Sequence, residues 1–239
     1  MSEENKRSIR ISVRNLVEFV LRSGDIDNRR SGNAQKDAML AGGRIHRKIQ
    51  KRMGSGYRAE VPLKHEVTDD EQEIVLSVEG RADGIFTENG ITVIDEIKGM
   101  YTDVARLEAP IEVHLAQAMC YGYFYCCDKD LDGIRLQLTY CNLETEEIRR
   151  FQTDRSKEEL EQWFSGVVHE YFKWARYLYH HELTRDASIR NLEFPYPYRE
   201  GQRDLVVSVY RTISRKKRLF IQAPTGIGKT LSTVFPAVR

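Results

Sequence analysis

Residues 80–99 have the sequence GRADGIFTENGITVIDEIKG, which predicts a β-hairpin with charged side chains on both strands. Asn89 and Gly90 separate two runs rich in β-branched residues. An Asn-Gly pair at such a place is the strongest short-range signal for a two-residue type I′ turn. This turn pairs Glu88 with Ile91, so the numbers of directly opposed residues sum to 179.

In that register Asp83 lies opposite Glu96. Strand alternation puts Glu96 and Lys98 on one face and Asp95 on the other. Opposed Cβ atoms are about 4.5–5.5 Å apart, so the two carboxylates repel each other. A divalent metal ion between them removes this penalty, and Lys98 is placed to stabilise a developing oxyanion or to orient an attacking water.

The residues alone also allow a simpler interpretation, in which the hairpin has no metal site. Acidic side chains near a hairpin tip are often simply solvated. The pattern [DE]-x-K also occurs a second time, at Glu4–Lys6, so by itself it identifies no site.

Away from the hairpin, hydrophobic periodicity and turn residues predict an alternation of helices and strands. The expected helices cover residues 12–22, 34–53, 110–127, 156–181 and 201–214. The expected strands cover residues 57–68, 73–81, 84–87, 91–98, 133–141, 146–153 and 219–222, and residues 25–33 are expected to form a loop.

Four motifs together resemble the PD-(D/E)xK nuclease superfamily. A strand ending in G-x-x-D-G, here Gly80–Gly84, followed by a hairpin strand with [DE]-x-K, here Glu96–Lys98, is its signature. His46 in GGRIH on the preceding helix and the Q-x-x-x-Y of residues 117–121 on the following helix are similar to its RecB-type branch. The resemblance implies an α/β fold with a mixed central sheet flanked by helices, and metal-dependent hydrolysis of DNA.

The resemblance also implies a metal site. Asp83, Glu96 and the backbone carbonyl of Ile97 would ligate Mg²⁺ or Mn²⁺. His46 would be a further ligand or would tune the metal, although a lone histidine on a helix is more often structural.

The same resemblance implies roles for three further residues and shows two departures. Lys98 would act on the attacking water or the scissile phosphate, and Gln117 and Tyr121 would position DNA or the active-site strand. Ala82 stands where the superfamily's name implies proline. Many RecB-type relatives hold an iron–sulfur cluster with one cysteine before the nuclease core, but here no cysteine precedes Cys120, so we expect no such cluster within residues 1–239.

The helix that carries His46 has a basic side without an acidic residue. Such a run is usually a solvated face, whereas beside a phosphodiester site it suits contact with a nucleic-acid backbone. Its members are Arg44, Arg47, Lys48, Lys51 and Arg52. On the strand before the hairpin, Glu60 and Glu66 are further acids that could join the site.

Residues 219–230, LFIQAPTGIGKT, predict a strand running into a phosphate-binding loop. Backbone N–H groups of such a loop cradle phosphates, its lysine reaches the β- and γ-phosphates, and its hydroxyl holds Mg²⁺. The loop and the upstream F-P-Y-x-Y-R-x-G-Q of residues 194–202 resemble the XPD/DinG branch of superfamily 2 helicases, where the upstream motif contributes to adenine recognition. The residues expected to bind ATP are Gln202, Ala223, Thr225, Gly226, Gly228, Lys229 and Thr230.

Charge divides the chain near this motif. Residues 196–239 have a net charge of +7, and the residues before them a net charge of −6. We expect a PD-(D/E)xK-like nuclease domain over residues 1–185, then a linker and the truncated start of a helicase ATP-binding domain over residues 186–239. The later strands and second lobe that a helicase motor needs are absent, so we expect the rest of the helicase in cis.

Composition indicates the cellular location of the protein, and three functions remain to be distinguished. The apolar runs are far shorter than the roughly 20 residues of a membrane helix, no secretory signal is visible, and four cysteines form no disulfide framework, so we expect a cytoplasmic protein. The first function is a Mg²⁺- or Mn²⁺-dependent deoxyribonuclease fused to an ATP-dependent helicase that acts on single-stranded or forked DNA. The alternatives are a catalytically weak DNA-binding or loading module, and a nucleotide-binding fragment with a structural N-terminal half.

Overall fold

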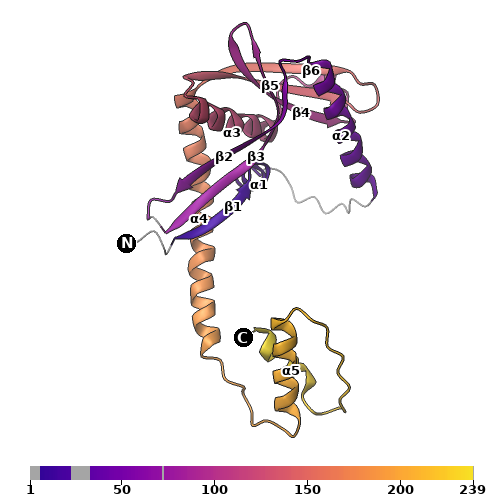
Figure 1. Ribbon diagram of the computed structural model, residues 1–239, viewed down its shortest axis with the longest axis vertical. Helices are drawn as coiled ribbons and strands as arrows, with labels where there is room; N and C mark the ends of the chain where they lie inside the picture. The colour runs from indigo at the N-terminus through magenta and orange to yellow at the C-terminus, as the bar shows by residue number, and fades with distance from the viewer. Residues whose placement is uncertain (1–5, 23–32, 72, 239) are drawn as a thin grey trace. The chain divides into compact units, whose positions relative to one another are not determined.

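The computed structural model describes residues 6–22, 33–71 and 73–238, and it contains two compact units, Met1–Ala175 and Arg176–Arg239. The first unit is built on a six-stranded sheet with both parallel and antiparallel neighbours and with helices packed against it (Figure 1). The expected class, α/β with a mixed central sheet flanked by helices, is therefore confirmed. The expected loop 25–33 and the motif at residues 4–6 fall almost wholly outside the described residues.

The elements follow the order expected from the sequence, and further elements are present. The strands are β1 (Arg7–Ser12), β2 (Arg58–Thr68), β3 (Ile74–Glu88), β4 (Ile91–Met100), β5 (Gly133–Asn142) and β6 (Ile148–Ser156). The helices are α1 (Val13–Val20), α2 (Asn33–Arg52), the 3-10 turn η2 (Val104–Arg106), α3 (Glu112–Lys129), α4 (Lys157–Arg190), α5 (Gln202–Ser214) and α6 (Lys229–Val238). The additional strand is β1, in which Ile9 and Ile11 alternate with charged and polar residues.

The long strand β3 organises the sheet. It is one strand of 15 residues, whereas the sequence predicts two. β2 pairs antiparallel along one edge of β3. On the other edge, β1 pairs parallel with Ile74–Glu79, and β4 then pairs antiparallel with Gly84–Glu88 in the register expected from the Asn-Gly turn.

β4 leaves β3 after Asp95 and continues beside β5. The last β3–β4 pair is Gly84 with Asp95, whereas the parallel β4–β5 pairing extends to Met100. The sheet is therefore split between β3 and β4 at Asp83 and Glu96.

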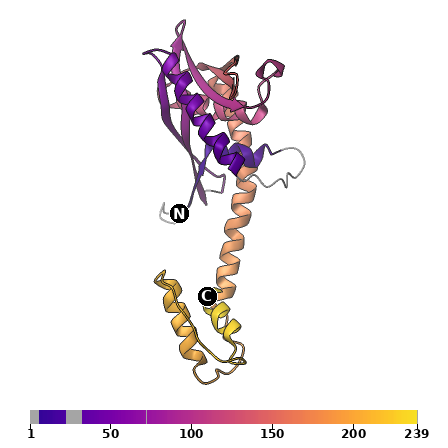
Figure 2. The same ribbon diagram turned by 90° about the vertical axis from the view of Figure 1, so that its right-hand side faces the viewer.

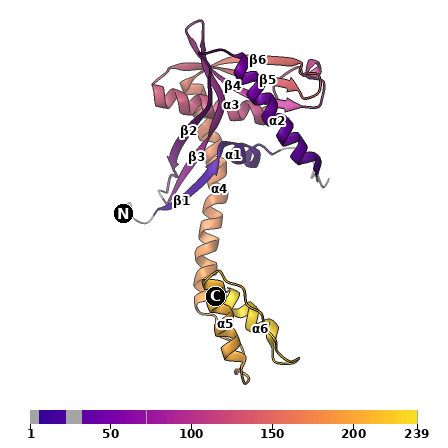
Figure 3. The same ribbon diagram turned by 45° about the vertical axis from the view of Figure 1, so that its right-hand side comes forward.

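The helices α2 and α3 cover opposite faces of β4 (Figure 3). Ile97 packs in a buried cluster with Ile45 and Ile49 of α2, whereas Lys98 contacts Gln117 of α3. Because successive residues of a strand point to opposite faces, one helix lies on each side of the split.

Two tyrosine rings explain the glycines on either side of Asp83. A Cβ atom at Gly80 would lie 2.6 Å from the hydroxyl of Tyr121, and one at Gly84 would lie 1.9 Å from the ring of Tyr57. Both rings therefore pack directly on the backbone of β3, and the G-x-x-D-G motif leaves room for them.

The second unit contains the end of α4 together with α5 and α6, which pack against each other (Figure 2). Phe194 stacks on Tyr198 at 4.3 Å between ring centroids and meets Phe235 edge-on at 5.2 Å. The predicted strand 219–222 is wrong: in the described part of the chain these residues have no strand partner, and Phe220 is 94% exposed. A strand depends on backbone hydrogen bonds to a neighbour, and none of the described residues forms a strand beside this segment.

Within the described residues, no helix combines the length and the apolar character needed to cross a bilayer.

We expect Gly84→Ala to destabilise the first unit by roughly 1–3 kcal/mol, because the new methyl group must displace the Tyr57 ring and its hydrogen bond to Asp95. Urea unfolding followed by tryptophan fluorescence measures this, since both tryptophans, Trp163 and Trp174, lie in the first unit. The control is Gly166→Ala in α4, where a Cβ meets nothing within 4 Å and helix propensity favours alanine. Equal unfolding midpoints for the two variants would contradict the packing argument.

Candidate functional site

The split between β3 and β4 is closed by a side chain. Asp83 is the first residue of β3 beyond the last pair with β4, and its Oδ2 accepts a hydrogen bond of 2.7 Å from the backbone amide of Ile97. The carboxylate thus replaces the strand partner that β3 no longer offers to β4. This contact places Asp83 directly beside the backbone of the Glu96–Lys98 segment.

Helix α2 reaches the same carboxylate from its other side. His46 Nδ1 lies 3.3 Å from Asp83 Oδ1. One turn later, Gln50 Nε2 donates to the backbone carbonyl of Asp83 at 3.0 Å and to Glu60 Oε1 at 3.2 Å. His46 therefore points toward the expected site.

The sequence did not decide whether Glu60 belongs to the site. In the structure Glu60 shares its partner Gln50 with Asp83. It lies on β2 between residues paired with Ala82 and Gly84, and its φ of 54° is in the left-handed region. Such a conformation is uncommon outside glycine and interrupts the β2–β3 ladder opposite Asp83. Glu66 lies farther along β2 and pairs with Lys64 at 2.7 Å.

Glu96 and Lys98 form the second half of the site. Lys98 Nζ lies 2.7 Å from Glu96 Oε1 and donates to Gln117 Oε1 at 2.7 Å. The Glu96 side chain is 5% exposed, and its Oε2 has no hydrogen-bond partner among the described residues. A buried carboxylate oxygen without a partner costs free energy. Such an oxygen is a suitable ligand for a divalent cation.

The electrostatics of the site reflect crowded charges. Burial, together with the negative charge of Asp83, raises the pKa of Glu96 to about 7 despite the attraction of Lys98. Burial lowers the pKa of His46, but the hydrogen bond and charge of Asp83 outweigh it, so that pKa is raised overall.

His46, Asp83 and Glu96 do not form a compact three-ligand group. Among the described residues, their ligand atoms are not gathered within 4.8 Å of one another. Asp83 is turned to Ile97 and His46, whereas Glu96 is turned to Lys98. The structure therefore brings His46 to Asp83 and Lys98 to Glu96, and the two carboxylates are near enough for the charge of Asp83 to act on Glu96.

Helix α3 fixes both strands of the hairpin. Gln117 holds Lys98 of β4, and the hydroxyl of Tyr121 hydrogen-bonds to the backbone of Arg81 in β3. The two side chains are one helical turn apart, so a single helix sets the positions of Lys98 and of the segment that carries Asp83.

The sequence placed Asp95 on the opposite face of the hairpin but did not predict its burial or its partners. Asp95 is fully buried and accepts hydrogen bonds from Thr139 at 2.6 Å, from Gln137 at 3.0 Å and from the hydroxyl of Tyr57 at 3.0 Å. These bonds join β4 to β5 and to the tyrosine that packs on Gly84. The available signal was an acid at an inward position of an apolar strand, which requires partners when it is buried.

His114 is a second residue that sequence reasoning missed. It lies one turn before Gln117 on α3, with Nδ1 3.2 Å from the hydroxyl of Tyr140. Burial and the positive charge of Lys98 lower its pKa to about 4, so its imidazole is neutral near pH 7.

The loop of the second unit that the sequence predicts to bind phosphate contains two glycines in left-handed conformations, Gly226 with φ 84° and Gly228 with φ 81°. Lys229 Nζ donates to the carbonyl oxygens of Ala223 and Pro224, both at 2.9 Å. Arg199 donates to the carbonyl oxygen of Gly226.

Gln202 of α5 reaches the same loop. It is buried, accepts a hydrogen bond from the Arg199 amide at 3.0 Å, and lies so close to Gly228 that a Cβ there would be 2.6 Å from its Nε2. Beside it is a cavity of about 540 Å³. Six of the residues expected to bind ATP line this cavity: Gln202, Thr225, Gly226, Gly228, Lys229 and Thr230. The seventh, Ala223, accepts a hydrogen bond from Lys229 through its carbonyl oxygen.

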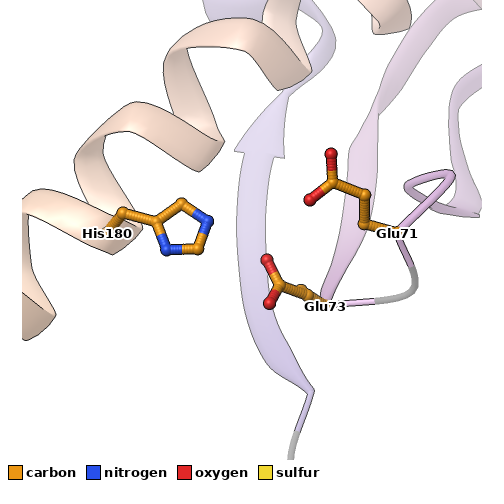
Figure 4. A group of neighbouring side chains, drawn as sticks. All are labelled: Glu71, Glu73 and His180. Atoms are coloured by element: carbon orange, nitrogen blue, oxygen red, sulfur yellow. The ribbon is translucent and has the colours of Figure 1, made fainter.

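Two other carboxylates, Glu71 and Glu73, lie in the β2–β3 connection of the first unit (Figure 4). His180, drawn with them, belongs to the second unit. This pair precedes the start of β3, whereas Asp83 lies in the second half of that strand, so the two groups of carboxylates are distinct.

Similarity to known proteins is limited. No protein-family model matches the chain. Over 47 residues, 19% of this chain, the sequence is 45% identical to a probable ATP-dependent helicase of Methanocaldococcus jannaschii, and the matched segment is only 7% of that protein.

Two solved structures are distantly similar in shape. One is the protein SSO0001, with a TM-score of 0.44 and 18% identity over 70% of this chain and 77% of the other. The other is an alkaline exonuclease from Laribacter hongkongensis, with a TM-score of 0.43 and 12% identity over 73% of this chain and 94% of the other. At these distances the likeness gives no information on activity.

We expect Glu96→Gln to change how stability depends on pH when no metal is present. Because the pKa of Glu96 is raised from 4.5 to about 7, the folded protein binds more protons than the unfolded chain between these values. The stability from that proton is complete below pH 4.5 and is lost as the pH rises to about 7. The variant should therefore be more stable than the wild type above pH 7, and the difference should shrink toward pH 4.5.

Urea unfolding in EDTA at a series of pH values tests this expectation. Glu66→Gln is the matched control, because Glu66 is exposed and its pKa is lowered by Lys64. If Glu96→Gln and the wild type have parallel stability–pH curves, the buried, crowded state of Glu96 is refuted.

Proposed function

We propose that the first unit is a metal-dependent nuclease that hydrolyses phosphodiester bonds of DNA. The observation that carries the proposal is the meeting of Asp83, Glu96 and Lys98 at the split between β3 and β4. The unpartnered Glu96 Oε2 supports a metal at this place, since a cation supplies what the buried oxygen lacks.

In this proposal Asp83, Glu96 and the backbone carbonyl of Ile97 hold Mg²⁺ or Mn²⁺. When bound, such an ion polarises the phosphoryl oxygen and lowers the pKa of a bound water. His46 holds the Asp83 carboxylate in place through the contact at 3.3 Å.

Lys98 is the group that acts on the phosphate or on the attacking water. Its ammonium group is fixed between Glu96 and Gln117, so it is oriented before the substrate arrives. Gln117 and Tyr121 are positioning residues, since each holds one strand of the hairpin.

We propose that the second unit is the start of the ATP-binding domain of a helicase, with residues 1–185 as the nuclease and 186–239 as the linker and nucleotide-binding segment. The cavity between Gln202 and Lys229 supports this, and so does the identity of 45% over 47 residues to a probable ATP-dependent helicase. The rest of such a helicase, in cis, would move single-stranded or forked DNA toward the nuclease.

We expect the chain to cleave end-labelled single- or double-stranded DNA when Mn²⁺ is present, and Lys98→Ala to slow cleavage by about 10²–10³-fold because the transition-state charge loses a preorganised cation. Lys64→Ala, at an exposed lysine of β2, is the matched control and should cleave like the wild type. The lengths of the products distinguish endonuclease from exonuclease action.

A folded wild type that binds DNA but does not cleave it would refute the nuclease and favour a DNA-loading module instead.

We expect Lys229→Ala to abolish binding of ATP·Mg²⁺ to the second unit, because the loop loses the ammonium group that reaches the phosphates. A fluorescent ATP analogue titrated with the chain measures this. Lys217→Ala, at an exposed lysine after α5, is the control. Equal binding by the two variants would argue against a phosphate-binding role for the loop.

A further inference from the structure

Helix α2 has three distinct sides around its axis. Ile45 and Ile49 face the core with Ile97, and His46 and Gln50 face Asp83. At about 100° per residue, the next side around the helix after His46 and Gln50 is the outer one. It carries Arg47, Lys51 and Arg44, which we call the outer stripe.

The five basic residues of α2 differ in their partners. Lys48 forms an ion pair with Glu146, and Arg52 Nη2 lies 3.8 Å from the same carboxylate. The members of the outer stripe are exposed and make no ion pair within the part of the chain that the structure describes.

Glu146 is held in place by its own turn. It lies between β5 and β6 with φ 59°, and its amide donates to the Asn142 carbonyl oxygen at 3.0 Å. The Asn142 side chain accepts from the amides of Glu144 and Thr145 at 2.8 and 2.9 Å. A rigid turn therefore presents one carboxylate to two of the five cations.

The outer stripe has the dimensions and charge to follow a nucleic-acid backbone. Its members occupy positions i, i+3 and i+7, a length of about 10 Å at 1.5 Å per residue. That length equals about three nucleotides of one strand at 3.4 Å each. The outer stripe adjoins the side of α2 that contacts Asp83, so a backbone bound there lies next to the side of the helix that faces the proposed metal site.

We propose that the outer stripe binds the phosphate backbone of DNA beside the nuclease site, and that Glu146 restricts this contact by occupying Lys48 and Arg52. The inference rests on the proposed nuclease function and adds the surface that binds the substrate and the residue that limits it. The contact is to phosphates, so it is independent of base sequence.

The test is DNA binding by the whole chain in EDTA, where the proposed cleavage does not proceed. Fluorescence anisotropy of a labelled single strand is measured over a series of salt concentrations. The variants are the outer-stripe triple Arg44→Ala/Arg47→Ala/Lys51→Ala, the matched double Lys48→Ala/Arg52→Ala, and Glu146→Gln.

The triple variant should weaken binding by roughly tenfold or more and reduce the slope of log affinity against log salt by about 2, because three phosphate contacts are lost. Glu146→Gln should tighten binding and steepen the slope by about 1, because Lys48 and Arg52 are released. The double variant should lose far less affinity than the triple, since Lys48 and Arg52 already share the Glu146 carboxylate.

Wild-type affinity in the triple variant, or no gain in Glu146→Gln, would overturn the inference. Tryptophan fluorescence confirms that each variant is folded. If the wild type cleaves DNA through Lys98 while the triple variant binds normally, the surface is wrong and the nuclease stands. If the triple variant loses binding while the wild type never cleaves, the surface stands and the nuclease is wrong.

Discussion

The hydrogen bond from the Ile97 amide to the Asp83 carboxylate is the contact on which the candidate site depends. It occurs where β4 leaves β3, so a backbone amide that has lost its strand partner gains a side-chain partner instead. An unpaired amide inside the fold would be costly, and the carboxylate removes that cost. The same bond fixes Asp83 beside Glu96 and Lys98. Asp83 therefore has both a structural role and a role in the proposed chemistry.

Each neighbouring element supports this arrangement from a different side. Tyr57 and Tyr121 pack on the glycines around Asp83, and Asp95 ties β4 to β5 from the face away from the site. The result is a rigid frame around groups that are costly to bury, above all Glu96. A frame of this kind is what preorganised catalysis requires, since the charges are placed before the substrate binds.

Much of this was predictable, and the failures have physical causes. The Asn-Gly turn and strict alternation set the hairpin register, so the faces of Asp95, Glu96 and Lys98 followed from local rules. Partners that come from distant segments did not follow, such as Thr139 for Asp95, because their meeting depends on the tertiary fold. The strand at residues 219–222 failed for the opposite reason: its local signal was sound, but no neighbour pairs with it among the described residues.

Binding of Mn²⁺ tests most directly whether Asp83 and Glu96 form a metal site. The free ion is followed by electron paramagnetic resonance as the whole chain is titrated. We expect one site that is lost in Asp83→Asn and in Glu96→Gln and is kept in Glu71→Gln/Glu73→Gln, which changes the other carboxylate pair. Binding that survives the first two variants, or that vanishes only in the double variant, would contradict a metal site at the split between β3 and β4.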